Sequence, residues 1–152
     1  MKNARTVLFM LLALVIGITL GGYLFADTQP RSFLAFNKCE GTCFQPNELM
    51  GLLTSVGIHK FPALLPSVVK ETDRTVVVEH PAPEARIHYI VIPKRDIKNI
   101  GQLSDADRES LIDAFAVVRE IVNEKSLVNY RVTTNGPGYQ GVTYLHFHLT
   151  AR

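Results

Sequence analysis

The feature that most constrains this chain is an uncharged run, TVLFMLLALVIGITLGGYLFA, which extends from Thr6 to Ala26. A helix rises about 1.5 Å per residue, so this run would form a helix roughly 31 Å long, enough to cross the core of a bilayer. So uniform an apolar helix leaves no polar face for water. The run therefore predicts a transmembrane helix at residues 6–26.

A cleaved signal peptide is the alternative to an anchor. The apolar region of a signal peptide is shorter, about 7–15 residues, and ends in a small-x-small cleavage pattern. Here bulky Leu24 stands three residues before a cut after Ala26, so we expect an uncleaved signal-anchor. Lys2 and Arg5 precede the run, and charges of both signs follow it. This asymmetry favours a single-pass protein whose domain lies on the extracytoplasmic side of the membrane.

The rest of the chain has room for one domain, because the whole sequence is 152 residues long. A net charge of +2 indicates no large basic surface, so we expect no nucleic-acid partner. The expected organisation is an anchor at residues 6–26, a connector and helical segment at 27–74, and a domain at 75–152.

The connector contains the two cysteines, Cys39 and Cys43, in the segment KCEGTC. A local disulfide fits this spacing if the segment turns as a helix, although Gly41 leaves the geometry open. Zinc is the alternative, but a single CxxxC without a second ligand pair is a weak metal signal. Because export implies an oxidising compartment, we expect a disulfide between Cys39 and Cys43.

Hydrophobic periodicity predicts the remaining elements. A helix over 46–57 would end at Gly57, and residues 61–72 would form a short helix or an irregular piece. Strands are expected at residues 75–80, 86–93, 130–134 and 142–149. A long helix is expected at 104–125, with Ser104 as N-cap. Its apolar stripe would consist of Leu111, Phe115, Val118 and Val122. Strand pairs on both sides of one long helix predict an α+β fold with an antiparallel sheet.

The last strand carries the candidate chemistry, in TYLHFHL. Alternate strand residues share a face, so Tyr144, His146 and His148 would be displayed together, and the apolar residues between them would pack under the helix. From the residues alone, three interpretations stay open. The histidines could be a structural pair, a nucleophile and a donor for phosphate chemistry, or a pair of metal ligands.

Two segments, HYIVIPKRDIKNIGQLSDAD and NGPGYQGVTYLHFHL, resemble the histidine-triad (HIT) family of nucleotide hydrolases and transferases. The likeness covers roughly Thr75 to Leu149. It implies a HIT-like antiparallel sheet packed with one long helix, and a nucleotide or nucleotide-like phosphate ligand. Family members are often homodimers, so the resemblance also implies a homodimer. It implies no cofactor and no metal.

By position, His146 matches the family's nucleophile, which attacks the α-phosphorus and forms a nucleotidyl-histidine intermediate. The resemblance assigns four further residues to the substrate site: His88, Asn135, Gln140 and His148. Tyr144 stands in place of the first triad histidine, and we also expect it at the substrate.

Two further departures from the family pattern lie near the site. His80 stands where many members have an acidic residue near the sugar, and Gly141 where many have a serine facing the phosphate. These changes argue for altered, slower or absent activity more than for a different fold.

The predicted function is that of a membrane-anchored HIT-like phosphohydrolase or nucleotidyl transferase. Its substrates would be nucleotide phosphate esters or phosphoramidates. One alternative is a nucleotide-binding protein without turnover, since Tyr144 has replaced a triad histidine. The other is a divalent-metal site on His146 and His148, with Tyr144 or His88 nearby.

Overall fold

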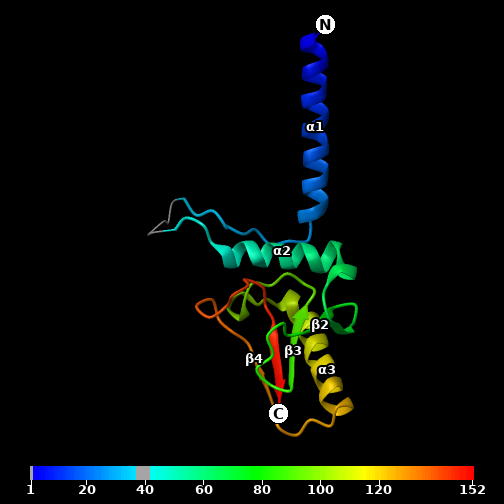
Figure 1. The fold of residues 1–152 in the computed structure, drawn as a ribbon, viewed down its shortest axis with the longest axis vertical. Coiled ribbons are helices and arrows are strands. Elements are labelled where there is room, and N and C mark those ends of the chain that lie inside the picture. The colour runs from blue at the N-terminus through cyan, green and yellow to red at the C-terminus, as the bar shows by residue number, and fades with distance from the viewer. Residues whose placement is uncertain (1, 37–41) are drawn as a thin grey trace.

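The computed structural model describes residues 2–36 and 42–152, and its long N-terminal helix extends away from the folded unit formed by the later elements (Figure 1). That helix is α1 (Lys2–Phe25). Its portion Asn3–Phe25 is long and apolar enough to cross a membrane, and its most apolar window is not buried against the rest of the chain. The expected apolar helix is therefore present, and its insertion in a membrane remains a prediction.

The folded unit is built on one five-stranded sheet in the order β1-β2-β3-β5-β4, in which every neighbouring pair is antiparallel. The strands are β1 (Val68–Glu71), β2 (Thr75–Glu79), β3 (Ile87–Pro93), β4 (Tyr130–Thr133) and β5 (Phe147–Ala151). The predicted α+β class with an antiparallel sheet is confirmed.

One face of the sheet is covered by α3 (Arg108–Glu124), which follows a short 3-10 turn, η3 (Asp105–Asp107). The main-chain N–H and hydroxyl of Ser104 donate to Asp107 Oδ2 at 2.8 and 2.7 Å, so the predicted cap is present. The buried residues of α3 are Ser110, Ala114, Val117, Val118 and Ile121. The predicted stripe was therefore only partly right: Phe115 is half exposed, although its ring lies 5.1 Å from that of Phe147.

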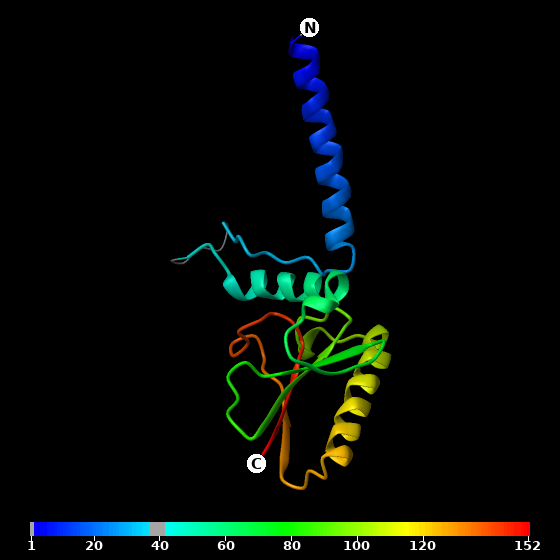
Figure 2. The same ribbon diagram turned by 45° about the vertical axis from the view of Figure 1, so that its right-hand side comes forward.

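The other face is partly covered by α2 (Pro46–Lys60), which lies across the C-terminal end of α1 (Figures 1 and 2). Ile58 of α2 packs against Val76 and Tyr144 in a second, smaller apolar cluster. At Gly51 the backbone of α2 lies close to the backbone of the segment before β5. A Cβ at this position would lie 2.4 Å from the carbonyl oxygen of Thr143. A glycine is required at this position because the helix backbone touches another segment of backbone.

The prediction that α2 ends at Gly57 was wrong. The helix continues to Lys60, and Phe61 N donates to the Gly57 carbonyl at 3.0 Å. Burial of Ile58 offsets the roughly 1 kcal/mol that a glycine costs inside a helix.

The segment after α2 forms both a short helix and a strand. The turn η1 (Pro62–Leu64) agrees with the expected short helix, whereas β1 was not predicted. β1 is a mostly exposed edge strand, and its register against β2 is irregular. Because neither face of β1 is well buried, its sequence lacks the alternation of apolar and polar residues from which a strand is predicted.

The last strand also begins later than expected, at Phe147 rather than Val142. Tyr144 N donates to the Val142 carbonyl, and Leu145 N to the carbonyl of Ile97. These bonds hold the preceding residues in a bent segment outside the sheet ladder.

Cys43 lies in the connector and no free cysteine is among the described residues. Cys39 lies outside those residues, so the expected Cys39–Cys43 pairing stays a prediction.

Candidate active site

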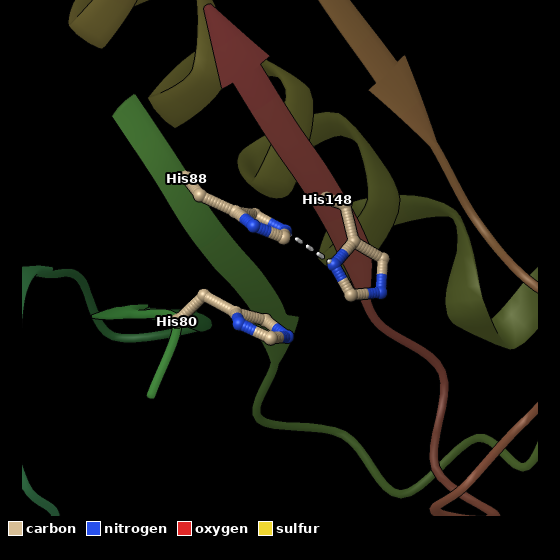
Figure 3. A group of neighbouring side chains, drawn as sticks. All are labelled: His80, His88 and His148. Atoms are coloured by element: carbon tan, nitrogen blue, oxygen red, sulfur yellow. Dashed lines mark hydrogen bonds between the residues drawn. The ribbon is translucent and has the colours of Figure 1, made fainter. Parts of the chain in front are cut away.

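Four histidines gather on the sheet face opposite α3. His88 belongs to β3 and His148 to β5, while His146 precedes β5 and His80 follows β2. The register pairs Ile90 with His148, so His88 and His148 are diagonal neighbours on adjacent strands. Figure 3 shows His80, His88 and His148 with their rings turned toward one another.

A hydrogen-bond chain fixes the tautomers of two of these imidazoles. The main-chain N–H of Glu84 donates to His88 Nδ1 at 3.2 Å, so that nitrogen carries no proton. The proton of neutral His88 is then on Nε2, which donates to His148 Nδ1 at 3.0 Å (Figure 3). His148 therefore carries its own proton on Nε2, as a donor for a ligand.

His146 is oriented by the main chain. Its Nδ1 lies 2.7 Å from the carbonyl oxygen of Tyr144, and a carbonyl oxygen only accepts, so Nδ1 carries the proton. The Nε2 atom of neutral His146 is left with a free lone pair. The His146 and His148 rings meet edge to face, with centroids 5.0 Å apart.

The surroundings keep these imidazoles neutral. Burial lowers the pKa of His148 to about 4, and the nearby His146, His88 and His80 act in the same direction. Burial also lowers the pKa of His146, against the opposing effect of its bond to the Tyr144 carbonyl. The pKa of His88 is lowered by burial and by His80. At neutral pH His88, His146 and His148 are thus uncharged. His146 then presents the lone pair of its Nε2 atom, and His148 presents an Nε2–H.

His80 is a site residue that the predicted set omitted. Its ring stacks on that of His88, with centroids 4.0 Å apart and an interplanar angle of 5°. Its main-chain N–H donates to the His88 carbonyl at 2.9 Å. The signal was available: pairing the two expected strands as a hairpin with Glu79 opposite Tyr89 sets His80 beside His88.

Three of these side chains could hold a metal. One ligand atom from each of His80, His88 and His148 lies within 4.8 Å of the others. Two nitrogens on one tetrahedral zinc lie about 3.4 Å apart, close to the 3.0 Å between His88 and His148. The lone pairs of the parallel His80 and His88 rings do not converge, however, so His80 would have to leave its stack. Among the described residues the metal alternative is therefore moved from His146 to this trio, which would have to rearrange to bind an ion.

Tyr144 is not displayed beside the histidines as the sequence predicts. It is 1% exposed, and its hydroxyl donates to the carbonyls of Lys94 and Pro93 at 2.7 and 3.1 Å. Burial raises its pKa. The bent segment before β5 turns this side chain into the cluster under α2. Its contact with a ligand stays a prediction, and its burial favours a structural role.

The two amide residues of the expected site differ in their surroundings. Gln140 is buried, its Nε2 donates to the Lys98 carbonyl at 3.1 Å, and its Oε1 has no hydrogen-bond partner among the described residues. Asn135 is exposed in the loop after β4. Their roles at a ligand stay predictions.

Comparison with known proteins identifies the family. The family model described as "Scavenger mRNA decapping enzyme C-term binding" matches residues 64–151. An uncharacterized HIT-like protein of Synechococcus elongatus is 34% identical over 85 residues, which cover 54% of this chain and 75% of that protein. A similar protein of Rickettsia prowazekii is 33% identical over 85 residues, covering 54% and 71%. The chain belongs to the histidine-triad (HIT) family.

Solved structures share the fold. An HIT family hydrolase from Clostridium thermocellum has a TM-score of 0.57 and 26% identity, covering 66% of this chain and 89% of that chain. A histidine triad protein from Clostridium difficile has a TM-score of 0.55 and 27% identity, covering 60% and 84%. The HIT fold expected from the sequence is thereby confirmed.

Proposed function

We propose that this chain is a HIT hydrolase or nucleotidyl transferase that uses His146 as its nucleophile. The observation that carries the proposal is the bond from His146 Nδ1–H to the Tyr144 carbonyl, which directs the basic lone pair to Nε2. A neutral imidazole held in this tautomer is ready to attack phosphorus without first losing a proton. The hydrolase named among the solved relatives supports the same class of activity.

The reaction would proceed in two displacements. His146 Nε2 attacks the α-phosphorus of a nucleotide phosphate ester or phosphoramidate, the N–P bond forms, and the bond from phosphorus to the leaving group breaks. The N–H of His148 donates to a phosphate oxygen as charge develops there. Water, or an acceptor group in a transferase, then attacks phosphorus, breaks the N–P bond and restores His146.

The experiment is to trap the intermediate. The purified full chain in detergent is mixed with a panel of nucleotides labelled at the α-phosphate and quenched, and acid-labile labelled protein is measured. We expect labelled wild-type protein and no label in His146→Ala. The matched control is His59→Ala, since His59 bonds the Ser55 carbonyl within α2 and should label normally. Equal labelling of His146→Ala would overturn the assignment.

Binding without turnover is the second candidate. The observation that favours it is the burial of Tyr144, because the residue in the place of the first triad histidine is turned into the interior. Saturable nucleotide binding with no adduct and no product would establish this alternative. A homodimer also stays a prediction, and sedimentation of the full chain in detergent tests it.

Anchoring through α1, with the domain on the extracytoplasmic side, is part of the same proposal. Its support is the length, apolar composition and lack of burial of Asn3–Phe25. Carbonate extraction followed by N-terminal sequencing tests it. A soluble mature protein that begins near Asp27 would contradict it.

A further inference from the structure

The helix α2 has an apolar side that turns away from the domain. Its buried residues, Gly51, Ser55 and Ile58, share the side that packs on the domain. At 100° per residue, Leu49, Leu53 and Val56 lie on the opposite side. Leu53 on this outer side is 54% exposed, and Met50, at the flank between the two sides, is 45% exposed. In a surface helix such residues normally face a core.

Further apolar side chains are exposed in the segments that flank α2. They are Leu34, Phe36, Phe44, Phe61 and Leu64. Leu34 and Phe44 are held side by side by an isolated β-bridge. We call these five residues, with Met50 and Leu53, the apolar platform. Exposed apolar side chains that gather on one side of a protein are a typical sign of an interaction surface, so we treat these residues as candidates for one.

The position of the platform indicates what covers it. In both views α2 lies between α1 and the sheet, across the direction of α1, and the connector passes along α2 on the side of α1 (Figures 1 and 2). A bilayer crossed by α1 would therefore have its surface where α2 and the connector lie.

The end of α1 is fastened to the end of α2. The ammonium of Lys60 bonds Asp27 at 2.6 Å and lies 4.6 Å from the centre of the Tyr23 ring. Tyrosine and lysine in this arrangement are typical of the membrane–water boundary.

The connector is also fixed on the domain. Both guanidinium Nη atoms of Arg31 bond the Asp96 carboxylate at 2.6 Å, and both side chains are buried. The Arg31 Nη2 group donates in addition to the Thr143 carbonyl at 2.8 Å. The segment that follows α1 is therefore bonded to the domain through Arg31.

We infer that the platform lies in the bilayer interface, so that the domain rests on the membrane surface. This inference depends on the proposed anchoring through α1. A helix in this position has its apolar side about 5–10 Å into the boundary between headgroups and acyl chains. Tyr144 packs on Ile58 of α2, and His146 follows it by two residues. The segment that carries His146 is thereby in contact with the helix that we place at the membrane.

The sequence contains no tryptophan, which allows a direct test. The full chain is reconstituted in phosphatidylcholine vesicles, with or without acyl-chain bromine, as Leu53→Trp, Met50→Trp, Ile16→Trp or Val128→Trp. Val128 is the matched control, since it is an apolar residue at 87% exposure beyond α3. We expect blue-shifted emission and loss of intensity in brominated vesicles for the variants at 53 and 50. We expect neither effect at 128.

The variant at Ile16, in the middle of α1, separates two failures. If bromine quenches the tryptophan of Ile16→Trp while Leu53→Trp and Met50→Trp show water-like emission, the inference about the platform is wrong and the anchoring through α1 is supported. Water-like emission at all three positions contradicts the anchor and the platform together. Blue-shifted emission at 53 without bromine quenching would show that protein, such as a second copy of the chain, covers the platform, and would also overturn the inference.

Discussion

The two faces of the sheet are built from the same strands and differ in what they bury. Toward α3, alternate strand residues are aliphatic or aromatic and form one continuous apolar core with the helix. On the other face, the apolar cluster among the described residues is smaller: Ile58, Val76 and Tyr144 are buried in it, and four partly buried residues pack against them, Leu65, Val78, Ile92 and Val142. Beyond them the face carries imidazoles, and their desolvation is visible in the lowered pKa of His148 and of His146.

Along a single strand, residues that stabilise the fold therefore alternate with residues that could take part in a reaction. Apolar burial stabilises the fold on the α3 side, because each fully buried aliphatic side chain contributes about 1.5–3 kcal/mol. On the histidine side, hydrogen bonds to the main chain orient rings that burial has made neutral. Phe147 and His148 are consecutive residues, yet we expect their replacement to affect different properties.

The largest effect should follow from His146→Ala. Loss of the nucleophile should lower turnover by about 10⁴-fold or more, because the covalent route is removed. The free energy of unfolding should fall by less than in a core variant, since His146 is only partly buried and belongs to neither apolar cluster. Steady-state turnover and urea unfolding of the same preparation measure both. If this variant unfolds as easily as a core variant, the histidine face also contributes to stability, which would contradict the proposed difference between the two faces.

Leu149→Ala tests the other side of β5. Leu149 is fully buried in the core against α3, so its truncation should lower the free energy of unfolding by about 2–5 kcal/mol. Turnover per folded molecule should be preserved. Val128→Ala, at an exposed position, should change stability by less than about 0.5 kcal/mol. A specific loss of turnover in Leu149→Ala, without loss of stability, would break the comparison.

The sequence predicts this alternation well where it depends on one strand. His148 and Leu149 lie on the faces that a period of two assigns to them, and the capping box of Ser104 and Asp107 is present on the turn η3 that leads into the long helix. What a period of two does not give is the contact between segments. His80 lies beside His88 through the register of one hairpin, and Tyr144 is buried because α2, more than 80 residues upstream, supplies Ile58. The first contact follows once the two expected strands are paired, whereas the second depends on a distant segment that no local periodicity indicates.

A smaller effect concerns pH, through His148. Burial lowers the pKa of this imidazole to about 4, whereas in the unfolded chain it is about 6.5. Between these values the unfolded chain binds the proton more tightly, so stability falls as pH drops through this window and levels off below about pH 4. Urea unfolding from pH 7 to 4 should show a shallower dependence in His148→Asn than in wild type. Equal slopes would mean that burial does not disfavour the charged ring.

The smallest effect should come from Tyr144→Phe, which removes only the hydroxyl. The carbonyls of Lys94 and Pro93 would lose their donor, at a cost of about 1–2 kcal/mol of unfolding free energy. Turnover should not change, because the hydroxyl is occupied with the main chain and closed off from solvent. Tyr144→His is the sharper companion, since it restores the first histidine of the family. Its ring would be confined against Ile58, so we expect greater destabilisation and no gain in turnover. A rise in turnover in Tyr144→His, or a fall in Tyr144→Phe at unchanged stability, would assign position 144 to the chemistry of the histidine face instead of its packing.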